Sequence, residues 1–178
     1  SAFYFDIRKD TLYCDQINSK KRKSCVTILN ILLKSLLRWF APILSFTTEE
    51  IYQLISNSSK SIHLEKFLVF PEKFKNERLA RKWSELMKIR DECNISIEEK
   101  RASKEIGSSL EAELNIRLND KYKDVITNID LSELCIVSKT EVYFDEVSDI
   151  LVETKKASGD KCPVCWKISV EPCERHSQ

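Results

Sequence analysis

Apolar residues in the first part of the chain recur at the spacing of an α-helix. In the clearest segment they repeat at steps of three and four residues: Cys25, Leu29, Leu32 and Leu36. Asn18 or Ser19 can cap the start of this helix, and Pro42 ends or kinks it. Further apolar residues on both sides widen the stripe, so we expect this helix to be buried on most of its circumference.

Two more helices are predicted before the pattern changes. Thr47-Thr48-Glu49-Glu50 has the form of a capping box, in which Thr47 caps the helix and Glu50 reaches back to it, and this helix continues to Ile55. A longer helix carries a regular face, formed by Leu79, Trp83, Leu86, Arg90, Cys93 and Ile97. This second pattern fades near Lys104, and Gly107 ends it.

The hydrophobic period becomes alternating after Gly107. Between Glu111 and Leu118 apolar and polar residues alternate strictly, which predicts a half-buried strand. Residues 121–128 predict a short helix. Three further apolar segments predict strands: residues 134–137, 141–144 and 150–152.

These patterns predict a mainly α protein in three parts. We expect a helical bundle in residues 1–72 and a long helix with a small α+β junction unit in residues 73–156. Residues 157–178 then form a metal-binding module, for the reason given next.

The last part of the chain holds the motif with the most specific chemistry. Cys162-Pro163-Val164-Cys165 is a Cys-x2-Cys pair, and Cys173-Glu174-Arg175-His176 is a Cys-x2-His pair that follows after a gap of seven residues. Zn2+ prefers four nitrogen or sulfur ligands in a tetrahedron, and two tight turns of this kind can each supply two. We therefore predict one structural zinc ion held by these four side chains. The alternative is a frayed tail with free thiols.

Composition narrows the class of protein. The net charge is +1, so there is no global basic field, and the low content of glycine, two residues in all, favours helices. Seven cysteines without a signal peptide indicate reduced thiols in the cytosol. The longest apolar run, Ile28 to Phe40, is too short and too polar to span a bilayer. The chain starts at Ser1 without an initiator methionine, so we expect it to be a piece of a longer protein.

Four consecutive cations, Lys20, Lys21, Arg22 and Lys23, stand at the start of the helix that Ser19 begins. Like charges at a helix N-terminus cost about 0.3–1 kcal/mol each before screening, because the helix dipole is already positive there. The run is either a solvated charged face or a phosphate site, in which backbone N–H groups and basic side chains bind a polyanion together.

Trp166 follows the second cysteine of the metal motif directly, and Lys167 comes next. An aromatic face beside a cation on a rigid turn can stack an unpaired base. Alternatively, the indole covers the small zinc module, which has little core of its own.

Catalytic groupings are absent from the sequence. The chain has no glycine-rich phosphate loop, and His63 lies between Ile62 and Leu64, where it is best explained as a surface or core histidine. Four cysteines have apolar neighbours or apolar spacing and are interpreted as small core residues: Cys14, Cys25, Cys93 and Cys135.

Three segments carry recognisable motifs: SAFYFDIRKDTLYC in residues 1–14, RWFAPILSFTTEE in residues 38–50, and the region from Trp83 to Ala112. Together they resemble the bacterial-type isoleucyl-tRNA synthetases, a family of class I synthetases. The Cys-x2-Cys-Trp-Lys tail is similar to the terminal zinc module of that family. The resemblance covers essentially the whole chain and preserves the order of bundle, junction and zinc module.

The resemblance implies an anticodon-binding helical bundle that grips the anticodon stem-loop of tRNA(Ile), with a zinc-knuckle-like module that helps to hold the tRNA. It implies a cytoplasmic, monomeric parent enzyme whose other domains use ATP and Mg2+. The HIGH and KMSKS active-site signatures appear nowhere in the chain, so we expect this part to bind tRNA without catalysis. The family usually has cysteine where His176 stands, which makes three cysteines and one histidine the expected ligand set.

Two other functions fit the same residues. The chain could be a zinc-stabilised protein-interaction domain that docks a partner on the wide apolar stripe of the helix after Ser19. A redox sensor using Cys162 and Cys165 is the third possibility, but the adjoining Cys-x2-His pair and the lack of a βαβ pattern argue against it.

Overall fold

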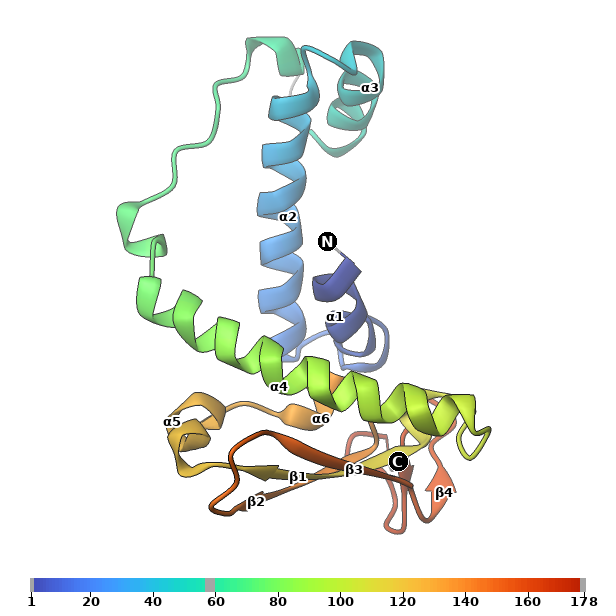
Figure 1. Ribbon diagram of the computed structural model, residues 1–178. Helices are drawn as coiled ribbons and strands as arrows, with labels where there is room; N and C mark the ends of the chain where they lie inside the picture. Colours follow the sequence, from blue (N-terminus) through green and yellow to red (C-terminus); the bar gives the residue numbers. More distant parts are fainter. Residues whose placement is uncertain (1, 57–59, 177–178) are drawn as a thin grey trace. The chain divides into compact units, whose positions relative to one another are not determined.

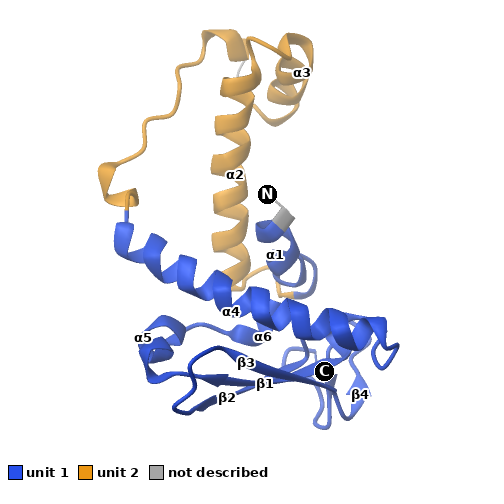
Figure 2. Ribbon diagram, in the orientation of Figure 1, with its two compact units in different colours: residues 1–14, 76–178 blue, residues 15–75 orange. Residues whose placement is uncertain are grey.

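The computed structural model describes residues 2–56 and 60–176 and has the predicted mainly α fold with one small sheet (Figure 1). The backbone divides into two compact units (Figure 2). The larger unit consists of Ser1–Cys14 and Asn76–Gln178, and the smaller unit is Asp15–Lys75. The three domains predicted from the sequence stay a prediction. No helix among the described residues is long and apolar enough to cross a membrane.

The smaller unit is built on the helix that the sequence predicts most clearly. This helix, α2, runs from Lys20 to Phe40, and the Ser19 side chain accepts a hydrogen bond from the Arg22 backbone N–H, as predicted. It ends two residues before Pro42. The remaining elements of the unit are α3 (Ser45–Ile55) and two short 3₁₀ turns, η1 (Ile62–Leu64) and η2 (Glu72–Phe74).

The predicted capping box at Thr47 is wrong. The N–H groups of Ile43 and Leu44 bond to the Phe40 carbonyl at 2.9 and 2.7 Å, so the chain turns tightly and α3 begins at Ser45. Thr47 therefore lies inside the helix. Glu49 fixes the following loop instead, because its carboxylate accepts hydrogen bonds from the hydroxyl of Ser61 (2.7 Å) and the N–H of Ile62 (2.9 Å).

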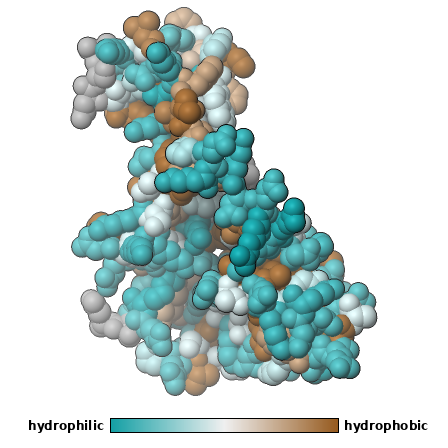
Figure 3. Space-filling model, turned by 90° about the vertical axis from the view of Figure 1, so that its left-hand side faces the viewer, coloured by the Kyte–Doolittle hydropathy of each residue, from teal (hydrophilic) through white to brown (hydrophobic). Residues whose placement is uncertain are grey.

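The expectation that α2 is buried on most of its circumference is also wrong. Among the described residues of α2, the buried ones are Cys25, Ser35 and Leu37. Ile28, Leu32 and Leu36 are 45%, 44% and 44% exposed. The core of the unit is small, consisting of Leu37, Ala41, Tyr52 and Ile62, because α3 and η1 pack against only part of α2. Apolar residues consequently appear on the surface of this unit, in the upper part of Figure 3.

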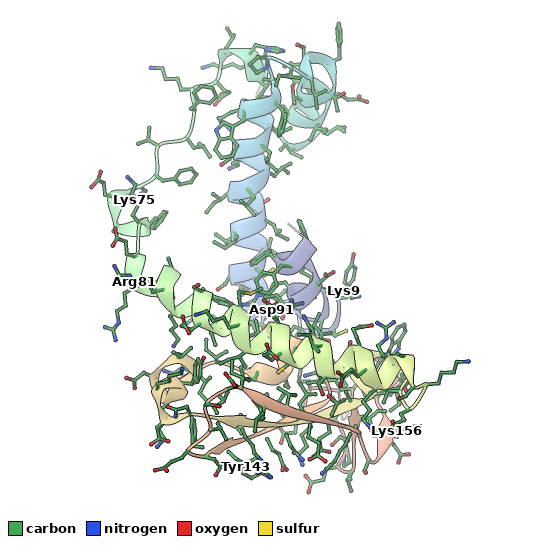
Figure 4. All side chains as sticks on the ribbon, in the orientation of Figure 1. Lys9, Lys75, Arg81, Asp91, Tyr143 and Lys156 are labelled. Carbon is green, nitrogen blue, oxygen red and sulfur yellow. The ribbon has the colours of Figure 1, made fainter. Side chains whose placement is uncertain are left out.

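A three-stranded sheet with strand order β2-β1-β3 forms the base of the larger unit. The central strand β1 (Ala112–Leu118) pairs in parallel with β2 (Lys139–Phe144) and antiparallel with β3 (Leu151–Lys156). The alternation seen in the sequence is confirmed, since four residues of β1 are fully buried: Ala112, Leu114, Ile116 and Leu118. Tyr143 lies on the other side of the sheet (Figure 4).

The long helix α4 (Glu77–Ala102) covers the buried face of this sheet (Figure 1). It buries Leu86, Ile89, Cys93 and Ile97 against the strands. The other helical elements of the unit are α1 (Ala2–Cys14), α5 (Lys123–Ile126), α6 (Leu131–Cys135), η3 (Ser109–Glu111) and η4 (Asp120–Tyr122). A two-stranded hairpin of β4 (Asp160–Lys161) and β5 (Ile168–Ser169) completes it.

The strand predicted for residues 134–137 is wrong, because this segment is the end of α6. The Asp130 carboxylate accepts hydrogen bonds from the N–H groups of Ser132 (2.9 Å) and Glu133 (3.1 Å), which starts the helix. Ile136 then adopts a left-handed conformation with φ of 57° and ends it. The other two predicted strands are confirmed: residues 141–144 lie within β2, and residues 151 and 152 of the segment 150–152 begin β3.

Candidate metal centre and basic helix terminus

The β4–β5 hairpin presents the first pair of cysteines. The Cys162 N–H bonds to the Lys167 carbonyl and the Trp166 N–H bonds to the Cys162 carbonyl, both at 2.9 Å, which closes the tight turn between Cys162 and Cys165. Trp166 takes a left-handed φ of 65° to complete it. Gly159 approaches the opposite strand so closely that a Cβ atom there would lie 2.2 Å from the Ser169 backbone, so only glycine fits.

A second turn brings the other two side chains to the same place. The His176 N–H bonds to the Cys173 carbonyl at 2.9 Å. One ligand atom from each of Cys162, Cys165, Cys173 and His176 lies within 4.8 Å of all the others, so the four residues of the sequence motif form one cluster. This arrangement could hold a metal ion.

Three distances within the cluster fit a tetrahedral zinc site. Ligands at about 2.3 Å for sulfur and about 2.0–2.1 Å for nitrogen place two sulfurs about 3.8 Å apart, and a sulfur and a nitrogen about 3.5 Å apart. The Cys165 and Cys173 sulfurs are 3.8 Å apart. His176 Nδ1 lies 3.5 Å from the Cys162 sulfur and 3.3 Å from the Cys173 sulfur. These three distances match tetrahedral coordination, and every pair of ligand atoms lies within 4.8 Å.

The outer nitrogen of the histidine ring has its own partner. His176 Nε2 lies 3.0 Å from the backbone carbonyl of Cys14, the last residue of α1. The Cys14 thiol lies 3.6 Å from the Val164 carbonyl, and Arg175 forms an ion pair with Asp10. Three contacts therefore join α1 to the two cysteine turns inside the larger unit.

The pKa values of the two buried thiols of the first turn are shifted in opposite directions. Burial acts to raise the pKa of the Cys162 thiol, but the backbone N–H groups of Cys165 and Val164 outweigh it and lower the pKa to about 6. Burial raises the pKa of the Cys165 thiol to about 12, and the neighbouring sulfurs of Cys162 and Cys173 add to this effect. A bound cation would stabilise all the thiolates and remove their mutual repulsion.

Trp166 projects from the first turn into solvent. It is 59% exposed, so the indole does not serve as a buried cover for the cysteine cluster. Lys161 Nζ lies 5.2 Å from the centre of the ring, which places a cation over the indole. Lys167 is turned toward α6, with its Nζ 3.4 Å from the Ser132 hydroxyl.

The basic run lies at the N-terminus of α2, in the smaller unit. Lys20, Lys21 and Lys23 are exposed, whereas Arg22 is half-buried and donates a hydrogen bond to the Asp15 carbonyl at 2.7 Å. An open hollow of about 620 Å³ lies beside this helix end and is lined by Asn18, Lys20, Lys23, Ser24, Thr27 and Ile28. Arg22 thus holds the preceding loop, and two of the lysines border the hollow.

Comparison with known proteins assigns the first two thirds of the chain to a family. Residues 1–116, which include α1, α2 and the basic run, match the family described as the anticodon-binding domain of tRNA ligase. The chain belongs to this family.

Members of the anticodon-binding family with similar sequences are isoleucine–tRNA ligases. The chain is 61% identical over 177 residues to the enzyme of Pelagibacter ubique, which covers 99% of the chain and 20% of that relative. It is 42% identical to the enzymes of Bradyrhizobium diazoefficiens and Methylacidiphilum infernorum over 95% and 96% of the chain, and 18% of each relative. The chain spans about a fifth of these curated relatives, and the predicted resemblance is confirmed.

Some residues around the metal centre of this anticodon-binding family member carry no signal in the sequence. Asp10 and Cys14 contact the two cysteine turns from α1, 150 or more positions away along the chain. A spacing motif identifies ligands within one short segment and has no means of finding such partners. A contact map of the family would be the signal able to reveal them.

The other cysteines are mostly core residues. Cys25, Cys93 and Cys135 are buried, while Cys14 is half-buried. A hydrogen bond with Cys135, together with burial, raises the pKa of the Cys93 thiol well above its usual range. Cys93 is therefore held as a neutral thiol in the packed core between α4 and the sheet.

Proposed function

We propose that the chain is the tRNA-gripping C-terminal part of an isoleucine–tRNA ligase. Its role is to recognise the anticodon stem-loop of tRNA(Ile) and to position the tRNA for ATP-dependent aminoacylation. The catalytic domains for that reaction, with their ATP and Mg2+, belong to the remainder of the parent synthetase. The observation that carries the proposal is the match of residues 1–116 to the anticodon-binding family. On this proposal the parent enzyme is cytoplasmic and works as a monomer.

A single structural zinc ion held by Cys162, Cys165, Cys173 and His176 is part of this proposal. The compact cluster of four ligand atoms supports it. When bound, the ion would cross-link the two turns and would have a structural role, not a catalytic one. Such a cross-link has a physical purpose, since residues 157–178 contribute only Ala157, Cys162 and Cys165 to the buried apolar residues described.

Phosphate contacts would come from the N-terminus of α2. The exposed amino groups of Lys20 and Lys23 border an open hollow beside the first turn of α2, and Lys21 adds a third exposed cation. Arg22 has a smaller part in this interface, since its guanidinium already bonds to the Asp15 carbonyl. Phosphate contacts of this kind fix the position of the RNA, while unstacked bases give specificity.

Trp166 and Lys167 are the proposed base-contacting residues of the zinc module. The exposed indole offers a face on which an unpaired base can stack, and Lys161 already supplies a cation at that ring. Lys167 lies on the α6 side of the same turn.

The test is the salt dependence of tRNA binding by the full chain. Lys20→Gln combined with Lys23→Gln should weaken binding of tRNA(Ile) and lower the slope of log K against log salt by about one unit per lost phosphate contact. The matched control is Lys73→Gln with Lys75→Gln, which removes the same charge from exposed lysines of the same unit. An unchanged slope in the helix variant, or an equal change in the control, would contradict the phosphate role.

A second function, a zinc-stabilised protein-interaction domain, is favoured by one observation. Ile28, Leu32 and Leu36 form an exposed apolar face on α2. In the parent enzyme this face would contact the remainder of the synthetase. Binding of bulk tRNA and capture of a protein partner, measured at the same salt concentration, distinguish the two functions.

A further inference from the structure

One side chain of the candidate metal centre makes contacts at both of its ring nitrogens. His176 Nδ1 points at the sulfurs of Cys162 and Cys173, at 3.5 and 3.3 Å. His176 Nε2 points the other way, at the Cys14 carbonyl, at 3.0 Å. The imidazole therefore lies between the ligand cluster and the C-terminal end of α1.

Metal binding would fix the tautomer of this ring. A metal ligand at Nδ1 needs a free lone pair there, so the ring hydrogen must be on Nε2. Nε2–H then donates to the Cys14 carbonyl. In the metal-free protein the hydrogen can instead reside on Nδ1 and face the sulfurs, which leaves Nε2 as an acceptor that repels the carbonyl oxygen.

The Cys14 carbonyl lies at the C-terminal end of α1, where it can accept a hydrogen bond from another part of the chain. The last four carbonyls of an α-helix have no partner within that helix, so a donor from elsewhere stabilises the helix end. Glu133 of α6 also holds α1, since its carboxylate accepts hydrogen bonds from Arg8 (2.7 Å) and Thr11 (3.3 Å). Cys14, the last residue of α1, contacts His176 and Val164, and Asp10 one turn earlier pairs with Arg175.

We propose that His176 is a positioning residue that couples occupancy of the metal site to the order of the last turn of α1. A cysteine at this position would supply a sulfur ligand but no hydrogen-bond donor that reaches Cys14. The chain continues from Cys14 directly into residues 15–19 and the basic N-terminus of α2. The inference rests on the proposed metal site and adds to it a link between zinc and the segment that leads to the proposed phosphate contacts.

The test is hydrogen exchange of the full chain, followed in peptides by mass spectrometry, with zinc and with a chelator. In the wild-type chain, zinc should slow exchange in the last turn of α1 by about three- to tenfold, as one added hydrogen bond implies. His176→Cys should still bind one zinc ion and protect residues 160–176, but zinc should slow exchange in α1 less than in the wild-type chain, because only the contacts of Arg175 and Val164 remain.

Two further variants keep the test decisive. Cys14→Ala removes the thiol contact with Val164 but keeps the backbone carbonyl, so it should retain the zinc effect on α1. His176→Gln keeps an N–H donor of similar reach but is a poor zinc ligand. Its α1 exchange should not respond to zinc, and it decides the question if His176→Cys does not fold. Peptides from α4 report whether each variant is folded.

The outcomes separate this inference from the function on which it rests. Zinc-bound His176→Cys with the full wild-type slowing of α1 overturns the coupling, as does a wild-type chain in which zinc protects residues 160–176 and leaves α1 unchanged. His176→Gln with full zinc-dependent slowing of α1 overturns it as well. A wild-type chain that retains no zinc instead overturns the proposed metal site itself.

Discussion

Ser138 joins the β4–β5 hairpin, which carries Cys162 and Cys165, to the sheet, and its removal should destabilise the larger unit measurably. The Ser138 hydroxyl accepts a hydrogen bond from the Ile168 N–H at 2.6 Å and donates one to the Leu110 carbonyl. All three groups are partly buried. A net contribution of about 0.5–1.5 kcal/mol for each hydrogen bond gives an expected loss of about 1–3 kcal/mol for Ser138→Ala.

Urea denaturation of the zinc-loaded chain measures this loss, provided the larger unit is followed by a probe of its own, such as hydrogen exchange within β1. The slope of the transition should stay constant while its midpoint falls. Exchange at Ile168 should accelerate more than exchange in β1, because Ser138 holds the hairpin directly.

The matched control is Ser148→Ala, since Ser148 is exposed and its hydroxyl contacts only the neighbouring Asp149 among the hydrogen bonds described. A surface change of this kind should stay within about 0.5 kcal/mol. If Ser138→Ala and Ser148→Ala had equal midpoints and equal exchange at Ile168, the hydrogen bonds of Ser138 would not be what holds the hairpin.

Two further predictions concern the metal and acid stability. Cys165→Ser should lose the single equivalent of zinc that the wild-type chain retains after dialysis, whereas Cys25→Ser should keep it; metal analysis decides, and stoichiometric zinc in Cys165→Ser would rule out the ligand set. In the smaller unit, hydrogen bonds from Arg38 and then Tyr52 hold the pKa of Glu65 below its usual value of 4.5. The contribution of Glu65 to stability is therefore complete above that pH and lost as the pH falls through the lowered pKa. Denaturation should show that the wild-type chain is more stable than Glu65→Gln at neutral pH but not at acidic pH. A higher stability of the wild-type chain that persists in acid would contradict this reasoning.

The elements that could be predicted from the sequence are those whose pattern is long and regular. The strand β1 buries every apolar residue that its period of 2 selects. The helix α4 buries Leu86, Cys93 and Ile97 of its predicted face, while Leu79 at its first turn stays exposed. The strand predicted for residues 134–137 was wrong for the opposite reason, because the pattern there is short. A four-residue apolar run fits a buried strand or a buried helix end equally well, and the Asp130 cap decides for the helix.

The burial of α2 could not be predicted from its sequence. A wide apolar stripe indicates that other residues should cover it, but it does not show whether those residues belong to this chain. In this chain α3 and η1 cover one part, and Ile28, Leu32 and Leu36 stay exposed. The ligand cluster, in contrast, followed directly from spacing, because all four residues lie within fifteen positions of one another. A spacing motif therefore predicts a metal site well when all the ligands lie in one short segment.

The zinc module also shows why a local motif does not describe a complete site. Three long-range anchors hold its two turns in the larger unit: Ser138 at Ile168, Asp10 at Arg175 and Cys14 at His176. Each is a directional polar contact, and the module itself buries few apolar side chains. With so small a core, the proposed zinc ion would order the two turns together with these anchors around them. Loss of the ion should therefore release the anchors too, and the effect should reach α1, which shares two of them, before it reaches the core between α4 and the sheet.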